Sequence, residues 1–306
     1  MKFELTILGS NSATPLYNRN PTAQILNINE KLYLIDCGEG TQQQMLKFDV
    51  KASRIDFIFI SHLHGDHYFG LLGLLSSLHL NGRTKPIKII CPPPLKEIID
   101  MQFSFSQTEL QYQIDYTFTN SAISEVILDN SDVSVETIPL VHGIPCTGFL
   151  FREKKRLRKL IKETISEINI PAEYFTAIKK GADYTDNDGI VYKNDILTTD
   201  SAAPKTYAYC SDTSYNQSYF QQISNATLLY HEATFLHNML DRALLTQHTT
   251  VLQAADVALK TNANKLLIGH FSARYKTLHE LLEEARTVFP NTELAIEGKT
   301  FLIGDE

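Results

Sequence analysis

Cysteine is scarce in this chain of 306 residues, and its few cysteines are not spaced for a C-x-x-C site. The four cysteines, Cys37, Cys91, Cys146 and Cys210, lie far apart, and each borders an apolar run. We therefore expect reduced side chains in a core rather than a disulfide framework. This usage argues against a disulfide-stapled secreted protein and fits the cytoplasm.

Long hydrophobic runs are absent as well. No apolar stretch approaches the roughly 20 residues that are needed to span a bilayer. The first residues lead directly into a strand-like pattern without a signal peptide, and the chain has no internal repeats and no low-complexity tract. We expect a cytoplasmic protein that makes no contact with membranes.

Basic residues are outnumbered, because 28 Lys and Arg against 35 Asp and Glu give a net charge of −7. Proteins that bind nucleic acid over a broad surface usually carry an excess of Lys and Arg, so any such affinity must be local here. The length exceeds a usual single domain, but an α/β domain with one large insertion reaches it. We expect one domain, residues 1–306, with an insertion.

The densest group of metal-capable side chains is the run from Ile60 to His67, which reads ISHLHGDH. Neutral imidazole and ionised carboxylate are ligands that suit zinc, and packing does not explain such density. The alternative is a polar loop whose histidines are satisfied by the backbone, but clustered polar groups without partners are costly. We therefore expect a metal site.

The residues before this run and the spacing within it indicate where the ligands lie and how many ions they could bind. Arg54 to Ile60 is β-branched and aromatic and predicts a buried strand, and the following glycine is expected to break any helix in the cluster. The ligands would then occupy a strand-to-helix loop. His62 and His64 can converge on one ion, leaving Asp66 and His67 to face a second ion about 3.5–4 Å away.

Two candidate ligands follow later strands. Val133 to Leu140 predicts a strand that leads into His142; a single histidine there is more often structural, but the metal cluster is short of a ligand, so we take it as the third. Asp212 follows the apolar strand Tyr207 to Cys210. On its own, this aspartate could instead cap a helix beginning near Ser214.

In chain order these motifs resemble the metallo-β-lactamase superfamily: a strand, H-x-H-x-D-H, a single His, an Asp at a strand end and a last His, His270, at another strand end. Further segments resemble ribonuclease Z, the tRNA 3′-processing endonuclease family, over nearly the whole chain. These segments are Gly38-Glu39-Gly40-Thr41-Gln42, Gly70-Leu71-Leu72-Gly73-Leu74-Leu75, His231-Glu232-Ala233-Thr234 and Phe271-Ser272-Ala273-Arg274-Tyr275.

The resemblance implies a four-layer αββα fold of the α/β class, with two β-sheets face to face and helices outside. It also implies two Zn²⁺ per chain, which would activate a water molecule for attack on phosphorus. The implied ligands are His62, His64 and His142 for the first ion, Asp66, His67 and His270 for the second, and Asp212 as the bridge between them.

Three residues receive catalytic roles from the same resemblance. Asp66 is the general base, and Glu232 and His248 together deliver a proton to the leaving oxygen, as an imidazolium held by a carboxylate can do near pH 7. On sequence alone, His248 could equally be a solvent-facing residue that precedes a helix from Thr249 to Lys260.

The implied activity is zinc-dependent endonucleolytic removal of the 3′ trailer from precursor tRNA, which leaves a 3′ hydroxyl on the tRNA. The family further implies a homodimer in which one subunit supplies an arm to the other's cleft. A different enzyme, a binuclear zinc phosphodiesterase for small molecules, and an RNA-binding protein with a dead site are the alternatives. The complete ligand set argues against the dead site.

The insertion, residues 152–200, begins with the segment Arg152 to Lys162, which has seven basic residues and one acid. Its spacing predicts a helix with Leu157, Leu160 and Ile161 on one face, and its charges form either a solvated surface or contacts to phosphates. In ribonuclease Z this location holds the flexible arm that grips tRNA, which makes the segment a candidate tRNA exosite.

Three positions depart from the ribonuclease Z pattern. Ala172 follows Pro171 where the arm often has a Gly-Pro pair, and Tyr17 stands where a lysine is common. Both changes concern substrate recognition, including the handling of a 3′ CCA end. Ser211 replaces a glycine beside the bridging aspartate.

Overall fold

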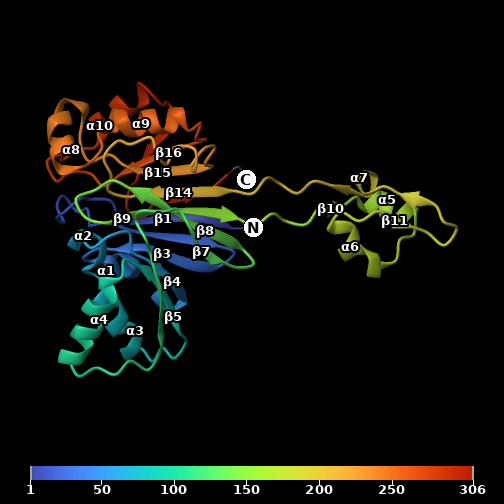
Figure 1. The fold of residues 1–306 in the computed structure, drawn as a ribbon, viewed down its shortest axis with the longest axis horizontal. Coiled ribbons are helices and arrows are strands. Elements are labelled where there is room, and N and C mark those ends of the chain that lie inside the picture. Colours follow the sequence, from blue (N-terminus) through green and yellow to red (C-terminus); the bar gives the residue numbers. More distant parts are fainter. Residues whose placement is uncertain (1, 305–306) are drawn as a thin grey trace. The chain divides into compact units, whose positions relative to one another are not determined.

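The computed structural model describes residues 2–304, in two compact units, residues 2–152 with 205–304 and residues 153–204. The first unit contains two seven-stranded sheets (Figure 1). In spatial order the first sheet consists of β18 (Thr300–Leu302), β1 (Phe3–Gly9), β2 (Ala23–Ile28), β3 (Lys31–Cys37), β4 (Ile55–Phe59), β5 (Ile87–Cys91) and β6 (Ile114–Phe118). The second consists of β17 (Thr292–Leu294), β16 (Leu266–Gly269), β15 (Leu228–Glu232), β14 (Thr206–Cys210), β9 (Cys146–Glu153), β8 (Val133–Leu140) and β7 (Val126–Asp129).

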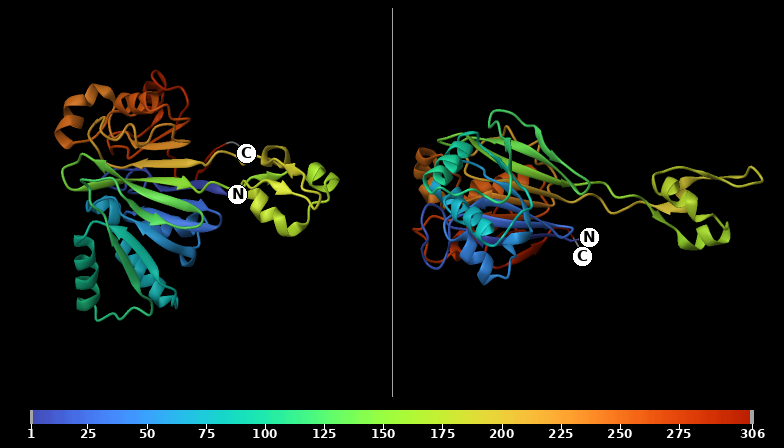
Figure 2. Two further views of the ribbon diagram at one scale, coloured as in Figure 1. Left: turned by 45° about the vertical axis from the view of Figure 1, so that its right-hand side comes forward. Right: turned by 90° about the horizontal axis from the view of Figure 1, so that it is seen from below.

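Helices cover the outer face of each sheet, and both sets are visible in Figure 1 and, from two further directions, in Figure 2. The first sheet packs against α1 (Thr41–Lys47), α3 (Leu71–Leu80) and α4 (Pro94–Phe105). The second sheet packs against α9 (Val251–Lys260) and α10 (His279–Arg286). With the core between the sheets, this arrangement confirms the expected four-layer αββα fold.

The sequence pattern explains where the core lies. In β1 the side chains alternate between buried and partly exposed before the strand becomes fully buried. The parallel strands β15 and β16 are instead buried at every position, as is typical of strands covered on both faces. Between the sheets, the rings of Phe59 and Phe149 pack edge to face with centroids 5.1 Å apart. Truncation of such a buried ring typically costs about 3–5 kcal/mol.

Several expected elements have different boundaries or directions. Helix α4 (Pro94–Phe105) was not expected from the sequence, where three successive prolines indicate only the end of β5. Pro94 is the first residue of the helix, where its missing N–H costs nothing. Strand β6 is parallel to β5, although antiparallel strands were expected from Tyr112 onward. No helix begins near Ser214 in the described chain, so capping does not explain Asp212.

The segment from His62 to His67, called the metal loop below, also differs from the expectation at one residue. Gly65 does not exclude a helix but is the first residue of the short helix α2 (Gly65–Tyr68), so Asp66 and His67 lie in a helical turn. A glycine at the first position of a helix interrupts no internal hydrogen bond. The remaining short helices of this unit are η1 (Ala52–Arg54), η3 (His237–Met239) and α8 (Leu240–Thr246).

The second unit, residues 153–204, has a small core of its own around Ile165, Ile178 and Leu197. Its elements are β10 (Lys159–Leu160), α5 (Lys162–Glu167), η2 (Ala172–Tyr174), α6 (Phe175–Lys179), β11 (Tyr184–Thr185), β12 (Val191–Tyr192), α7 (Asn194–Leu197) and β13 (Thr198–Thr199). Strands β10 and β13 pair, and β11 and β12 form a hairpin across the expected turn at Gly189.

The prediction of a helix over Arg152 to Lys162 is wrong. Residues 154–158 have no regular structure, Lys159 pairs in β10, and a helix begins only at Lys162. The segment is held extended by tertiary pairing: the Arg158 N–H donates to the Lys179 carbonyl at 3.0 Å, and Lys159 and Leu160 pair with β13. In the described chain, residues 2–304, no helix is long and apolar enough to cross a membrane.

Candidate active site

The candidate site residues come from the carboxyl ends of strands in both sheets. His62 and His64 follow β4, His142 follows β8, Asp212 follows β14, and His270 follows β16. Strand β4 is parallel to its neighbour β3, and β15 is parallel to both β14 and β16, so the carboxyl ends of these strands lie at one edge of each sheet. Side chains that are far apart in sequence therefore converge there.

The first group consists of His62, His64, His142 and Asp212, whose ligand atoms all lie within 4.8 Å of one another. His64 Nδ1 is 3.1 Å from His62 Nε2 and 3.1 Å from His142 Nε2. Asp212 Oδ2 faces the same point, at 3.6 Å from His62 Nε2 and 3.7 Å from His142 Nε2.

The second group consists of Asp66, His67 and His270. His270 Nε2 is 3.3 Å from both His67 Nε2 and Asp66 Oδ2. The other oxygen of Asp212, Oδ1, lies 3.4 Å from His67 Nε2 and 3.3 Å from His270 Nε2. The structure thus brings together all seven sequence-predicted metal ligands and puts the Asp212 carboxylate between the two groups.

The residues fit a pair of divalent cations. Asp212 is buried, and its Oδ1 atom accepts no hydrogen bond in the described chain, which is costly unless a cation completes the site. The pKa of Asp212 is held well below its usual range, because His270, His67 and His62 outweigh the effect of burial. Imidazole nitrogens with a few carboxylates are a donor set that suits zinc.

Each ligand histidine of the second group is held through its other ring nitrogen. His67 Nδ1 donates to Asp36 Oδ2 at 2.8 Å, and His270 Nδ1 lies 3.0 Å from Thr234 Oγ1. In the first group, His142 Nδ1 donates to the carbonyl of Gln247 at 3.0 Å. Such partners fix the orientation of a ligand ring and present its free nitrogen to a metal.

Sequence reasoning missed Asp36, the carboxylate that orients His67. Asp36 is buried and also accepts hydrogen bonds from the Ser61 hydroxyl at 2.8 Å and from the Tyr209 hydroxyl at 2.6 Å. Its φ of 54° lies in the left-handed region, which is uncommon outside glycine. The available signal was an ionisable residue at the end of the apolar strand β3.

The catalytic pair that the sequence suggests is also assembled. His248 Nδ1 donates to Glu232 Oε1 at 3.0 Å. Burial alone would lower the pKa of His248, but the Glu232 carboxylate outweighs it and raises the pKa to about 9. Glu232 in turn accepts the backbone N–H of Thr249 at 2.8 Å and that of Thr234 at 3.0 Å. The neighbouring His231 instead lies 2.9 Å from the Tyr219 hydroxyl, outside the pocket.

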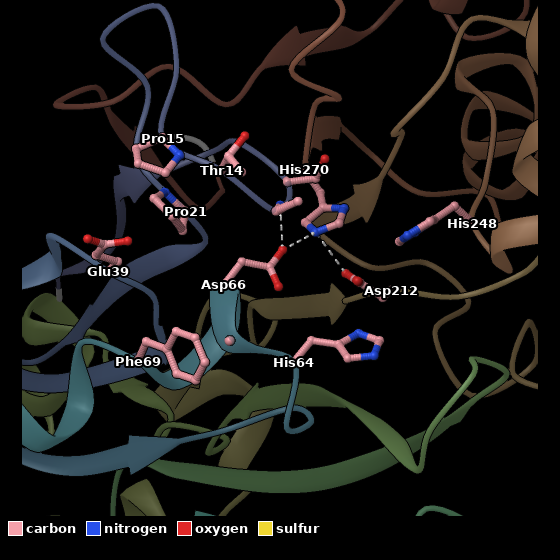
Figure 3. Close-up of a pocket in the computed structure, with 13 residues that line it drawn as sticks. Thr14, Pro15, Pro21, Glu39, His64, Asp66, Phe69, Asp212, His248 and His270 are labelled. Carbon is pink, nitrogen blue, oxygen red and sulfur yellow. Dashed lines mark hydrogen bonds and ion pairs between the residues drawn. The ribbon is translucent and has the colours of Figure 1, made fainter.

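A pocket of about 480 Å³ opens above the metal ligands, and Figure 3 shows the residues around it. Asp66, Asp212 and His270 lie at its centre, and His248 points toward them. The N-terminal loop closes one side, where the backbone N–H of Ala13 donates to Asp66 Oδ2 at 2.7 Å. The arrangement places a buried carboxylate, an imidazole paired with Glu232 and two groups of candidate cation ligands around one cavity.

Comparison with known proteins gives consistent results. Residues 3–158 match a family model described as "Anti-Pycsar protein Apyc1". Ribonuclease Z of Cytophaga hutchinsonii is 46% identical over 309 aligned residues, covering 100% of this chain and 97% of the relative. Ribonuclease Z of Bacteroides fragilis is 45% identical and covers 97% of this chain and 98% of the relative.

Among solved structures, human tRNase Z, short form, superposes with a TM-score of 0.72 at 26% identity, covering 99% of this chain and 100% of that chain. The metallo-β-lactamase fold protein YhfI from Bacillus subtilis, at 18% identity and a TM-score of 0.69, supports the fold alone. The match of residues 3–158 shows that the chain belongs to the family of the Apyc1 model. Its relatives, which are similar over nearly their full length, show that it belongs to the ribonuclease Z family.

Proposed function

We propose that this protein is a zinc-dependent endoribonuclease that removes the 3′ trailer from precursor tRNA and leaves a 3′ hydroxyl on the tRNA. The observation that carries the proposal is the position of Asp212, whose two oxygens face two separate ligand groups on the floor of a pocket lined by His248. The Ribonuclease Z relatives and the human tRNase Z structure support the choice of substrate.

His62, His64 and His142 would hold one Zn²⁺ and Asp66, His67 and His270 the other, with Asp212 as the shared ligand. When bound, two such ions lower the pKa of a water molecule and offset the negative charge that develops on the phosphate oxygens. Asp212 would be shared by both ions, because its Oδ2 faces the first ligand group and its Oδ1 faces the second.

The other site residues move or position protons. As water attacks phosphorus, Asp66 accepts a proton from it, and the Ala13 N–H holds the Asp66 carboxylate in place. The bond from phosphorus to the tRNA 3′ oxygen then breaks, and the His248 imidazolium gives this oxygen a proton. Glu232 positions His248 and keeps it charged at neutral pH.

Residues 153–204 form the tRNA exosite in this proposal. Within the unit, Arg156 pairs with Glu153 and Arg158 pairs with Asp200, so these two guanidinium groups already hold carboxylates. Lys155 and Lys159 are exposed on the same basic segment and are better placed to contact phosphates. We also propose a cytoplasmic homodimer, as the family resemblance implies.

The alternative is a binuclear zinc phosphodiesterase for small molecules, for which residues 153–204 would have no role. A single replacement separates the two functions. Arg152 and Thr206 are paired partners on the antiparallel strands β9 and β14, so a short Gly-Ser linker can join these strands in place of residues 153–204.

The shortened protein should keep both ligand groups and should still hydrolyse bis(p-nitrophenyl) phosphate. Its cleavage of precursor tRNA should fall steeply, because the phosphate contacts are removed while the chemistry is not. The intact protein, loaded with the same amount of zinc, is the control. If the shortened, folded and zinc-loaded protein cut precursor tRNA at the normal rate, the exosite assignment would be wrong.

A further inference from the structure

The pocket has an aromatic wall to which the reaction described above gives no role. Phe69, the residue after α2, lines the pocket, although 63% of its surface is exposed to solvent. In Figure 3 its ring lies on one side of Asp66, and His248 lies on the other side, beyond His270 and Asp212. Pro15 also lines the pocket.

The metal loop makes room for this ring. A Cβ atom at Gly65 would come within 2.2 Å of the Phe69 ring, so only glycine leaves the ring its position against the loop. Tyr68 contacts the ring from the side, with centroids 5.1 Å apart and planes at 68°. The backbone and one neighbour thus hold the ring while its solvent-facing surface stays uncovered.

The chemistry around Phe69 selects the kind of group that can bind there. Among the described residues, no Lys or Arg lines the pocket, and the carboxylate of Glu39 lies at the same end as Phe69. A phosphate would be repelled at this end. A nucleobase suits it, because a base can stack on the ring while a base N–H donates to the carboxylate. Single exposed apolar residues are common on surfaces, but this one lies beside the reacting centre.

The direction of the substrate follows from the proposed function, on which this inference rests. His248 gives its proton to the 3′ oxygen of the tRNA, so the last retained nucleoside lies toward His248. The RNA on the other side of the scissile phosphate, which is the 3′ trailer, then continues toward Phe69. We infer that Phe69 stacks on the first nucleobase of the 3′ trailer and positions the scissile phosphate over the metal ligands.

The test compares two precursor tRNAs that differ only at the first trailer nucleotide, which is either normal or abasic. Stacking of one base on an aromatic side chain contributes about 5- to 150-fold in binding. Phe69→Ala should therefore lower kcat/KM on the normal precursor by a factor in this range, and Phe69→Trp should restore most of it. On the abasic precursor, the ratio of wild-type to Phe69→Ala activity should fall toward one.

Phe105→Ala is the matched control, because Phe105 is 82% exposed at the end of α4 and does not line the pocket. It should behave as wild type on both precursors. Equal losses for Phe69→Ala on the normal and the abasic precursor would overturn the stacking role, as would no loss on either. Zinc content and melting temperature confirm that each variant is folded. Failure of the proposed function gives a different result, since the wild-type protein itself would then cut neither precursor.

Discussion

Removal of the His248 imidazole tests how the proton reaches the leaving oxygen. In the structure this ring lines the pocket beside the expected metal ligands, and its Nδ1 is occupied by Glu232 at 3.0 Å, so Nε2 is the atom that can serve the substrate. A positioned general acid contributes about 10²–10⁴-fold. We expect His248→Ala to lower kcat on precursor tRNA by this factor.

The raised pKa of His248, about 9, keeps the ring charged at pH 7, so the wild-type protein uses the full proton-donating capacity there. Glu232→Gln should lower kcat in the same direction but by less, because the ring stays in place while losing its ionic partner. The zinc content of both variants should match that of wild type, as neither residue belongs to the seven expected ligands.

The assay pairs two substrates, precursor tRNA and bis(p-nitrophenyl) phosphate. A p-nitrophenolate leaving group needs no proton, so the loss in His248→Ala should shrink on the second substrate. His237→Ala is the matched control. His237 lies on η3, its Nδ1 is 3.0 Å from Thr250 Oγ1, and it does not line the pocket. Equal losses of His248→Ala on both substrates would refute the acid role and indicate a structural histidine.

Three further predictions concern the bridge, the basic segment and a buried acid. Asp212→Ala should lose activity and most of the roughly two zinc ions expected per chain, measured by metal analysis; a variant with full zinc would contradict the bridge. Lys155→Ala with Lys159→Ala should reduce the log–log salt slope of tRNA affinity by about 0.9 per lost phosphate contact, whereas Lys47→Ala with Lys51→Ala should not. Burial raises the pKa of Glu297 to about 7, so the folded protein holds a proton that the unfolded chain releases above about pH 4.5. The unfolding free energy of wild type should therefore fall from pH 4.5 to 7 relative to Glu297→Gln in urea titrations, and parallel pH profiles would contradict this.

Much of the fold follows from local pattern in the sequence. The strand before the metal loop and the strand before His142 are readable from short runs of β-branched and aromatic residues. The direction of β6 is not readable, because it depends on pairing with β5 rather than on its own side chains. Helix α4 was missed since three prolines suggest an interruption, although the third starts the helix.

The site shows the same division between local and tertiary information. The cluster from His62 to His67 is visible as a motif, whereas the convergence of His142, Asp212 and His270 on it depends on how the second sheet packs against the first. Asp36 is not predicted from the sequence, because its role is to accept a hydrogen bond from Nδ1 of His67. The two residues are far apart in sequence, so no spacing motif indicates this contact. The apolar spacing of the basic segment predicts a helix, but local spacing does not reveal that Lys159 and Leu160 pair with Thr199 and Thr198.

The most direct test of the central claim is to map both ends of the products after incubation of the zinc-loaded protein with precursor tRNA. The account predicts one internal cut, with a 3′ hydroxyl on the tRNA and a 5′ phosphate on the released trailer. Removal of zinc by a chelator should abolish the cut, and added zinc should restore it. A protein that hydrolyses bis(p-nitrophenyl) phosphate but leaves precursor tRNA intact, or that yields a cyclic phosphate on the tRNA, would contradict the account.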